Sequence, residues 1–218
     1  APDYVLVRRD RIEDFVARYG EAVARFYPRL VDNPDYTSII NERHYRRLAG
    51  LVADARARGA RVVTIDPAGE LGQDEIGAGN TRKMLPALIV DPALDLEVMR
   101  EEIFGPILPV VAYDAIEDAI RLVNDRPRPL ALYYFDADSS RTREVLDRTV
   151  SGDAAINDTI FHVAQEDLPF GGVGASGMGA YHGHEGFRTF SHAKGAFHQA
   201  RWNFAGLVAP PYNARFRR

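Results

Sequence analysis

The segment EEIFGP places two adjacent carboxylates, Glu101 and Glu102, directly before an aromatic side chain, Phe104. A Gly-Pro pair then leads into the apolar segment ILPVVAY, which has the composition of a buried strand. The end of a solvated helix would account for the two acids, but it would not account for an aromatic residue beside them. The position of Phe104 is therefore the part of this segment that needs a further explanation.

A glycine-rich loop, FGGVGASGMGAYHGHEG (170–186), contains the spacing of a dinucleotide-binding fingerprint at Gly172-x-Gly174-x-x-Gly177. That fingerprint requires a strand before it, a helix after it, and an acid about 20 residues further on. The preceding DLPF is not a predicted strand, YHGHEG is a poor helix, and residue 197 is phenylalanine. The sequence therefore argues against a phosphate-binding loop here.

The same loop nearly matches a nucleophile elbow at Ser176, but Met178 stands where the final glycine belongs. Many glycines beside aromatic residues indicate a tightly folded loop whose backbone passes close to a ligand or to the rest of the protein. We favour tight packing as the reason for the glycines, and we do not expect Ser176 to be a nucleophile.

Histidines 182, 184 and 192 lie close enough in the sequence to suggest a metal site. They stand on an irregular stretch, and no pattern of carboxylates accompanies them. We therefore expect surface or hydrogen-bonded structural histidines and no metal, and we interpret His44 as a partly buried helix residue.

The dipeptide Asn157-Asp158 follows an apolar segment that is typical of a buried strand. Ligands in open parallel sheets bind beyond the carboxyl ends of the strands, which favours a site between residues 157 and 170. An Asx turn that closes the strand explains the same residues equally well. Both interpretations remain open on the sequence.

The chain alternates short apolar strands with amphipathic helices, which predicts an α/β domain with a mostly parallel sheet flanked by helices. The predicted strands are 4–7, 61–65, 86–91, 107–113, 130–135 and 153–157. Two predicted helices begin at the D-x-x-E capping boxes Asp10/Glu13 and Asp114/Glu117. Two further predicted helices cover residues 41–58 and 140–149. We expect Gly59 to end the second helix and Pro28 to end the first.

The composition of the 218 residues excludes several classes of protein. A net charge of −4 with 27% charged residues gives no support for a nucleic-acid-binding or polybasic membrane surface. The absence of cysteine excludes a disulfide scaffold and a thiolate zinc site. No apolar run approaches the roughly 20 residues of a membrane helix, and we expect a cytoplasmic protein.

The chain closely resembles the C-terminal half of an aldehyde dehydrogenase over essentially its whole length. EEIFGPILPV, NDRPRPLALYYF and LPFGGVGASGMGAYHGHEGFRTFSH occur in the order that this family has. EEIFGP and PFGGVGxSGxG together form a highly specific pair of motifs. LPFGGVGASGMGAYHG is similar to the dimeric class 3 or fatty-aldehyde branch, and AGLVAPPY is similar to the coniferyl aldehyde dehydrogenases within it.

This resemblance implies roles for five residues. In the family, the second acid of EEIFGP binds ribose hydroxyls of NAD or NADP and the phenylalanine packs near the nicotinamide, which assigns these roles to Glu102 and Phe104. A carboxylate only accepts hydrogen bonds and therefore suits a pair of hydroxyl donors. By the same resemblance Phe170 lines the substrate tunnel, while Phe161 and His162 help to shape it for an apolar or aryl aldehyde.

The resemblance also implies that no catalytic residue lies in this chain. In the family a cysteine thiolate forms a thiohemiacetal with the aldehyde, and a hydride then passes to NAD or NADP. The cysteine, the general-base glutamate, the oxyanion asparagine and the cofactor domain would all lie upstream of Ala1. We therefore expect the chain alone not to oxidise aldehydes.

Two interpretations of the chain follow. The first is a C-terminal fragment of an aldehyde dehydrogenase, with residues 1–190 in the catalytic domain, 191–218 as a tail with a role in oligomerisation, and a homodimer as the complete protein. The alternative is a stand-alone module without catalysis that docks onto full-length dehydrogenase subunits through an uncovered apolar face. The sequence does not distinguish NAD from NADP or identify the aldehyde.

Overall fold

A four-stranded sheet forms the centre of the computed structural model, which describes residues 2–72, 75–207 and 210. Its strand order is β1 (Val5–Arg8), β6 (Ile107–Tyr113), β5 (Ala87–Val90) and β2 (Arg61–Thr64). β1, β6 and β5 are parallel, whereas β2 pairs with β5 in the antiparallel direction. The predicted mostly parallel sheet is confirmed, and the reversed edge strand is a feature that the sequence analysis did not predict.

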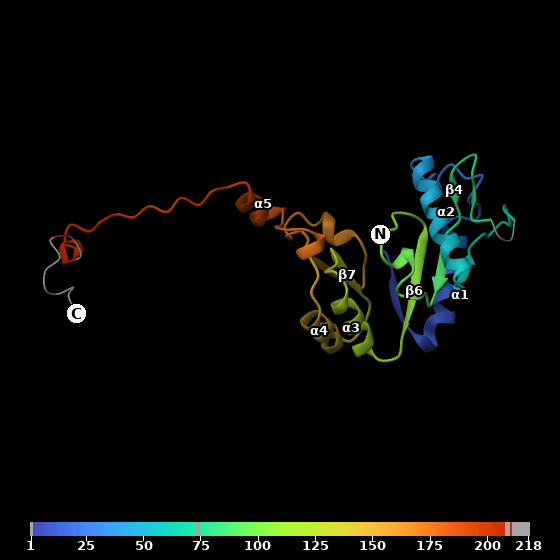
Figure 1. Ribbon diagram of the computed structural model, residues 1–218, viewed down its shortest axis with the longest axis horizontal. Helices are drawn as coiled ribbons and strands as arrows, with labels where there is room; N and C mark the ends of the chain where they lie inside the picture. Colours follow the sequence, from blue (N-terminus) through green and yellow to red (C-terminus); the bar gives the residue numbers. More distant parts are fainter. Residues whose placement is uncertain (1, 73–74, 208–209, 211–218) are drawn as a thin grey trace.

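Helices α1 (Ile12–Phe26) and α2 (Glu42–Ala57) cover opposite faces of this sheet (Figure 1). Along β5, Ala87 and Ile89 pack against the buried stripe of α2, while Leu88 and Val90 pack with Ile12 of α1. Successive side chains of a strand point to opposite faces, so a strand covered on both sides is apolar throughout. The result is three layers, with α2 held firmly against the sheet.

The rest of the chain builds a second, smaller α/β part (Figure 1). β7 (Ala131–Tyr134) and β8 (Asp153–Ile156) form a parallel two-stranded sheet, accompanied by α3 (Ile116–Asp125) and α4 (Ser139–Arg148). All predicted strands are present to within one or two residues. Elements that the sequence analysis did not predict are the hairpin of β3 (Gly77–Ala78) and β4 (Lys83–Met84) and the helix α5 (Gly183–Thr189).

The two predicted D-x-x-E capping boxes are wrong. A 3-10 turn (Arg9–Arg11) precedes α1, and Asp10 pairs with Arg8 at 2.5 Å while Glu13 pairs with Arg61 at 2.5 Å. These carboxylates therefore bind arginines instead of the free amides of the first turn. Phe26, the last residue of α1, is 66% exposed.

At α3 the capping carboxylate belongs to a different residue from the predicted one. Asp118 accepts a hydrogen bond from the Ala115 amide at 3.1 Å, while Asp114 pairs with Arg9 at 2.9 Å. By contrast, both predicted ends of α2 are confirmed. Asn41 accepts from the His44 amide at 2.9 Å, and Gly59 has a φ of +80° beyond the last turn.

Beyond α5 the chain leaves the body of the protein as an extended segment (Figure 1). Residues 191–204 form no helix or strand, and a 3-10 turn (Ala205–Leu207) follows. The rest of the predicted tail, apart from residue 210, lies outside the described residues. Within the described part of the chain, no helix is long and apolar enough to cross a membrane.

Candidate functional site

The segment EEIFGP forms the loop between a 3-10 turn (Glu97–Met99) and β6. Ile103 is buried in the core with 1% of its surface exposed, whereas its neighbours Glu102 and Phe104 are exposed, Phe104 at 81%. Phe104 also has a φ of +51°, a left-handed conformation that costs a residue with a side chain about 1–2 kcal/mol. Backbone strain of this kind is typical of functional sites.

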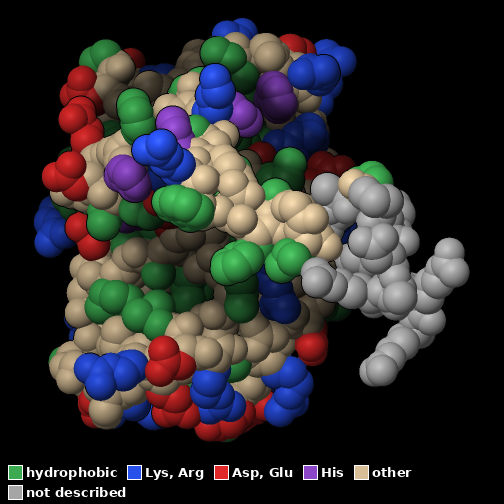
Figure 2. Space-filling view, turned by 90° about the vertical axis from the view of Figure 1, so that its left-hand side faces the viewer, with side chains coloured by type: hydrophobic (Ala, Val, Ile, Leu, Met, Phe, Trp, Pro, Cys, Tyr) green, Lys and Arg blue, Asp and Glu red, His purple; other side chains and the backbone are tan. Residues whose placement is uncertain are grey.

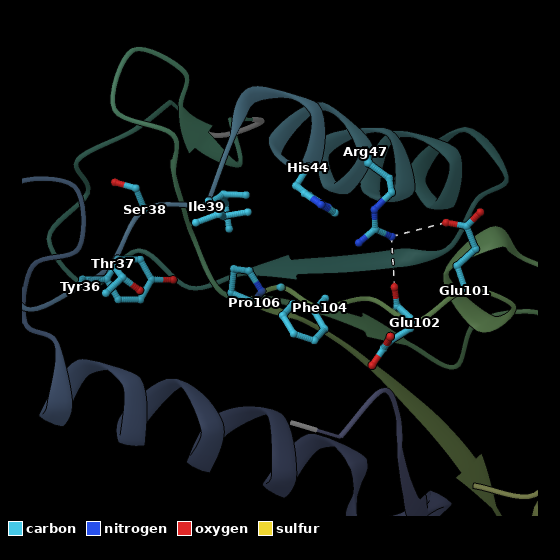
Figure 3. A pocket seen from close by; sticks show the side chains of 12 residues that line it. Tyr36, Thr37, Ser38, Ile39, His44, Arg47, Glu101, Glu102, Phe104 and Pro106 are labelled. Atoms are coloured by element: carbon cyan, nitrogen blue, oxygen red, sulfur yellow. Dashed lines mark hydrogen bonds and ion pairs between the residues drawn. The ribbon is translucent and has the colours of Figure 1, made fainter. Parts of the chain in front are cut away.

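Glu102 and Phe104 line one open groove of about 890 Å³ (Figure 3). α2 contributes His44 and Arg47 to this groove, and the segment 36–40 forms the remaining wall. The structure therefore brings the two predicted cofactor-binding residues together. His44 is a partly buried helix residue, as predicted, whereas Arg47 was not among the predicted site residues.

Arg47 fixes the main chain of the acidic loop. Its Nη1 lies 3.4 Å from Glu101 Oε2 and donates to the Glu102 carbonyl oxygen at 3.2 Å, while Nη2 donates to the Ile103 carbonyl oxygen. The Ile103 amide donates to Asp3 Oδ1 at 2.9 Å. Both polar main-chain groups of buried Ile103 are therefore satisfied by side chains that are distant in the sequence, as buried backbone groups require.

The two adjacent acids have different surroundings. The Glu101 carboxylate is turned toward Arg47, whereas the Glu102 carboxylate is turned away from it (Figure 3). Among the residues that the structure describes, the Glu102 carboxylate has no hydrogen-bond or ion-pair partner. An unpaired carboxylate beside an exposed aromatic ring fits a ligand that combines hydroxyl donors with a flat ring.

Tyr36 forms a fixed part of the opposite wall of the groove. Its hydroxyl donates to the Met84 carbonyl oxygen at 2.7 Å, and burial raises the pKa of this hydroxyl. A partly buried tyrosine that stays protonated and already donates its proton to the backbone is not a general base. Tyr36 therefore shapes the groove without taking part in proton transfer.

The predicted substrate-binding residues lie on the β7–β8 side of the protein, not on the four-stranded sheet that carries the groove (Figure 1). His162 contacts both Tyr133 and Phe170, with ring centroids 5.5 Å and 5.8 Å apart. Phe170 also packs against Tyr181 at 5.5 Å. Phe161 has no part in these ring contacts and is 66% exposed.

The histidines do not gather into a metal site. Among the described residues, no three side chains of His, Cys, Asp or Glu are placed to hold a metal ion. Both ring nitrogens of His162 and Nδ1 of His182 are buried and have no hydrogen-bond partner among the described residues. These two imidazoles pack in an aromatic cluster, with His182 4.4 Å from the ring centroid of Tyr181.

The glycines of the loop 170–186 allow the backbone to pack closely on itself. A Cβ on Gly171 would lie 2.0 Å from the Gly179 carbonyl oxygen, and one on Gly172 would lie 2.1 Å from that of Ser176. The Ser176 hydroxyl accepts from the Val173 amide at 3.0 Å. Tight packing, the favoured explanation from the sequence, is confirmed, and Ser176 is a turn residue.

Asn157 ties the ends of β7 and β8 together. Its side-chain oxygen accepts from the Asp136 amide and its side-chain nitrogen donates to the Asp136 carbonyl oxygen, both at 2.9 Å. Its own φ is +57°. Asn157 therefore does not close a simple Asx turn, because its side chain clamps two neighbouring strands.

Comparisons with known proteins agree with this architecture. The model of the aldehyde dehydrogenase family matches residues 1–195. A probable coniferyl aldehyde dehydrogenase of Pseudomonas aeruginosa is 53% identical over 212 residues, which are 97% of this chain and 42% of that protein. The chain thus spans less than half the length of this relative.

Solved structures give the same result. A substrate-bound structure of AldH from Staphylococcus aureus matches with a TM-score of 0.80 and 38% identity, over 100% of this chain and 45% of that one. A Mycobacterium tuberculosis aldehyde dehydrogenase in complex with NAD⁺ matches with a TM-score of 0.70 and 29% identity, over 86% of this chain and 38% of that one.

Proposed function

This chain belongs to the aldehyde dehydrogenase family, and we propose that it forms part of an enzyme that oxidises an aldehyde to a carboxylic acid with NAD or NADP. The observation that carries the proposal is the unpaired Glu102 carboxylate beside the 81% exposed Phe104 ring in one groove. The matched structure from M. tuberculosis holds NAD⁺, which supports a nicotinamide cofactor.

In this proposal the groove binds the nicotinamide half of the cofactor. Glu102 accepts hydrogen bonds from ribose hydroxyls, each worth about 1.5–3 kcal/mol for a charged acceptor. Phe104 contacts the flat nicotinamide ring and limits its movement. The cofactor, when bound, supplies the hydride acceptor for the aldehyde carbon.

We propose an apolar or aryl aldehyde as the substrate. Phe170 and His162, with exposed Phe161 nearby in the chain, would line the path of the aldehyde. The name of the P. aeruginosa relative, a probable coniferyl aldehyde dehydrogenase, supports an aryl aldehyde of the coniferyl type. In the net reaction, water supplies the second oxygen of the acid, the aldehyde hydrogen leaves as a hydride to the oxidised cofactor, and one proton is released to solvent.

The nucleophile of this reaction has to come from outside residues 1–218, because the sequence contains no cysteine. The isolated chain is therefore expected to reduce no NAD⁺ or NADP⁺ with coniferyl aldehyde. A complete protein that carries this sequence is expected to reduce one of them, and to prefer coniferyl aldehyde to acetaldehyde. If the complete protein forms no reduced cofactor with any aldehyde of a broad panel, the proposal fails.

The exposed apolar side chains favour a second candidate, a non-catalytic module that docks onto full-length dehydrogenase subunits. Figure 2 shows hydrophobic side chains around a hollow on one face, with charged side chains at its margins. Exposed large hydrophobic residues of the C-terminal part include Ile160, Phe161, Met178, Phe187 and Phe190. Size-exclusion chromatography of the isolated chain with a full-length aldehyde dehydrogenase would separate the candidates, because only a docking module forms a stable mixed complex.

A further inference from the structure

We propose that Arg47 is a positioning residue, which holds the main chain of Glu101, Glu102 and Ile103 so that the Glu102 carboxylate faces the groove unpaired. This inference rests on the proposed role of Glu102 in cofactor binding. It assigns to Arg47 no contact with the cofactor, only control of the residue that makes the contact.

The acidic loop depends on side chains for its conformation. Within the described part of the chain, its backbone hydrogen bonds outside helices and strands are those from the Glu101 amide to Glu97 and from the Ala87 amide to Pro106. Between these two points, Arg47 reaches three consecutive residues of the loop and Asp3 reaches one. Removing the guanidinium would therefore release the middle of the loop, where Glu102 lies.

The helix that carries Arg47 packs closely against the loop. Leu48, the next residue, is fully buried, and a Cβ on Gly105 would lie only 2.5 Å from its side chain. Arg47 and Leu48 therefore contact the loop before and after Phe104. The Arg47 side chain is 28% exposed, less than the 77% of its neighbour Arg46. Partial shielding from solvent strengthens its hydrogen bonds relative to those of a free surface arginine.

The contacts of Arg47 also explain why the two acids behave differently. The guanidinium binds the Glu101 carboxylate but meets Glu102 only at the main-chain oxygen, so that its charge is balanced without using the Glu102 carboxylate. A guanidinium offers five donors in a rigid planar fork, whereas a lysine offers one nitrogen. Lysine at this position can keep the charge, but its three donors share one nitrogen, which cannot occupy the positions of both Nη1 and Nη2.

The test uses the complete dehydrogenase that carries this sequence, with Arg47→Met and Arg47→Lys variants. Arg46→Met is the matched control, because Arg46 lies on the same helix and pairs only with Glu42, at 2.7 Å, among the contacts of its side chain in the described structure. Arg47→Met should raise the KM for the cofactor about tenfold without changing the KM for the aldehyde, as expected from losing charged hydrogen bonds. Arg47→Lys should restore part of this loss, and Arg46→Met should behave as the wild type.

A double-variant cycle separates positioning from a general structural role. If Arg47 acts through Glu102, then Arg47→Met combined with Glu102→Gln should raise the cofactor KM by less than the product of the two single effects. Multiplicative effects would overturn the inference, as would a normal cofactor KM in Arg47→Met when Glu102→Gln is impaired. If Arg47→Met does not fold, Arg47→Lys gives the same cycle. An unimpaired Glu102→Gln, or an inactive wild type, would instead reject the proposed function itself.

Discussion

Arg47 forms an ion pair with the Glu101 carboxylate at 3.4 Å, yet it meets the adjacent Glu102 only at the main-chain carbonyl oxygen, at 3.2 Å. Two adjacent glutamates thus have different roles in the structure. Glu101 takes part in holding the loop, and Glu102 keeps an unpaired carboxylate in the groove.

Removing the Phe104 ring should affect activity much more than stability. The side chain is 81% exposed, so Phe104→Ala should change the free energy of unfolding by no more than about 0.5 kcal/mol. If Phe104 limits nicotinamide movement as proposed, loss of its ring should slow hydride transfer in the complete enzyme about tenfold or more. Phe26→Ala is the control, because Phe26 is 66% exposed but does not line the groove. Equal single-turnover rates in both variants would contradict the role of Phe104.

The seating of the acidic loop on α2 can be tested by adding a methyl group. A Cβ on Gly105 would meet Leu48 side-chain atoms at 2.5 Å and 2.7 Å, and Leu48 is fully buried. Gly105→Ala should therefore destabilise the protein by about 1–3 kcal/mol, as overpacking of a core does. Gly50→Ala, at an exposed position of α2, has no atom within 4 Å of its Cβ and should stabilise by about 0.5–1 kcal/mol. Urea unfolding of the two variants measures both effects, and destabilisation of similar size in both would refute the close contact.

Glu70 should make stability depend on acidity. Its carboxylate accepts hydrogen bonds from the amides of Leu30 at 2.6 Å, Val31 at 2.9 Å and Asp32 at 3.2 Å, and these donors lower the pKa of Glu70 from 4.5 to about 2. A lowered folded-state pKa contributes stability above the ordinary pKa, and this contribution disappears as the pH falls from 4.5 toward 2.

The measurement compares the free energy of unfolding of the wild type and of Glu70→Gln across this acidic range. The variant should be less stable than the wild type near neutral pH, and the difference should shrink as the pH falls. Glu97→Gln, which changes an exposed acid that does not contact the segment 30–32, should show no such trend. A difference in unfolding free energy that stays constant with pH would show that the Glu70 charge does not hold the segment 30–32 in place.

Most elements of the fold could be predicted from the sequence because they depend on local patterns. The strand ILPVVAY (107–113) was predicted with its observed ends, and Asn41 and Gly59 mark the ends of α2 through their own side-chain and backbone chemistry. The predicted capping boxes do not form because Asp10 pairs with Arg8 and Asp114 pairs with Arg9, which is distant in sequence. Two features depend on contacts between distant segments, which no local pattern encodes. One is the antiparallel direction of β2, and the other is that β7 and β8 form a sheet of their own.

Only the part of the candidate site that lies in a local sequence motif could be predicted. The motif EEIFGP led to Glu102 and Phe104 through its resemblance to a family, but nothing in the motif leads to Arg47, which is 54 residues from Glu101. A signal was nevertheless present. Arg47 stands one helical turn before buried Leu51 and two turns before buried Ala55, so it lies on the apolar face of α2. A charged residue on such a face needs a partner, and Glu101 supplies it.

The most direct test of the account is the cofactor KM of Glu102→Gln in the complete dehydrogenase that carries this sequence. Glutamine keeps the shape of the side chain and removes its charge. We expect the KM for NAD⁺ or NADP⁺ to rise about tenfold or more, because hydrogen bonds from ribose hydroxyls to a charged acceptor are lost. Glu97→Gln, which does not alter the groove, should keep the wild-type value. A wild-type KM and hydride-transfer rate in Glu102→Gln would contradict the assignment of this groove to the cofactor.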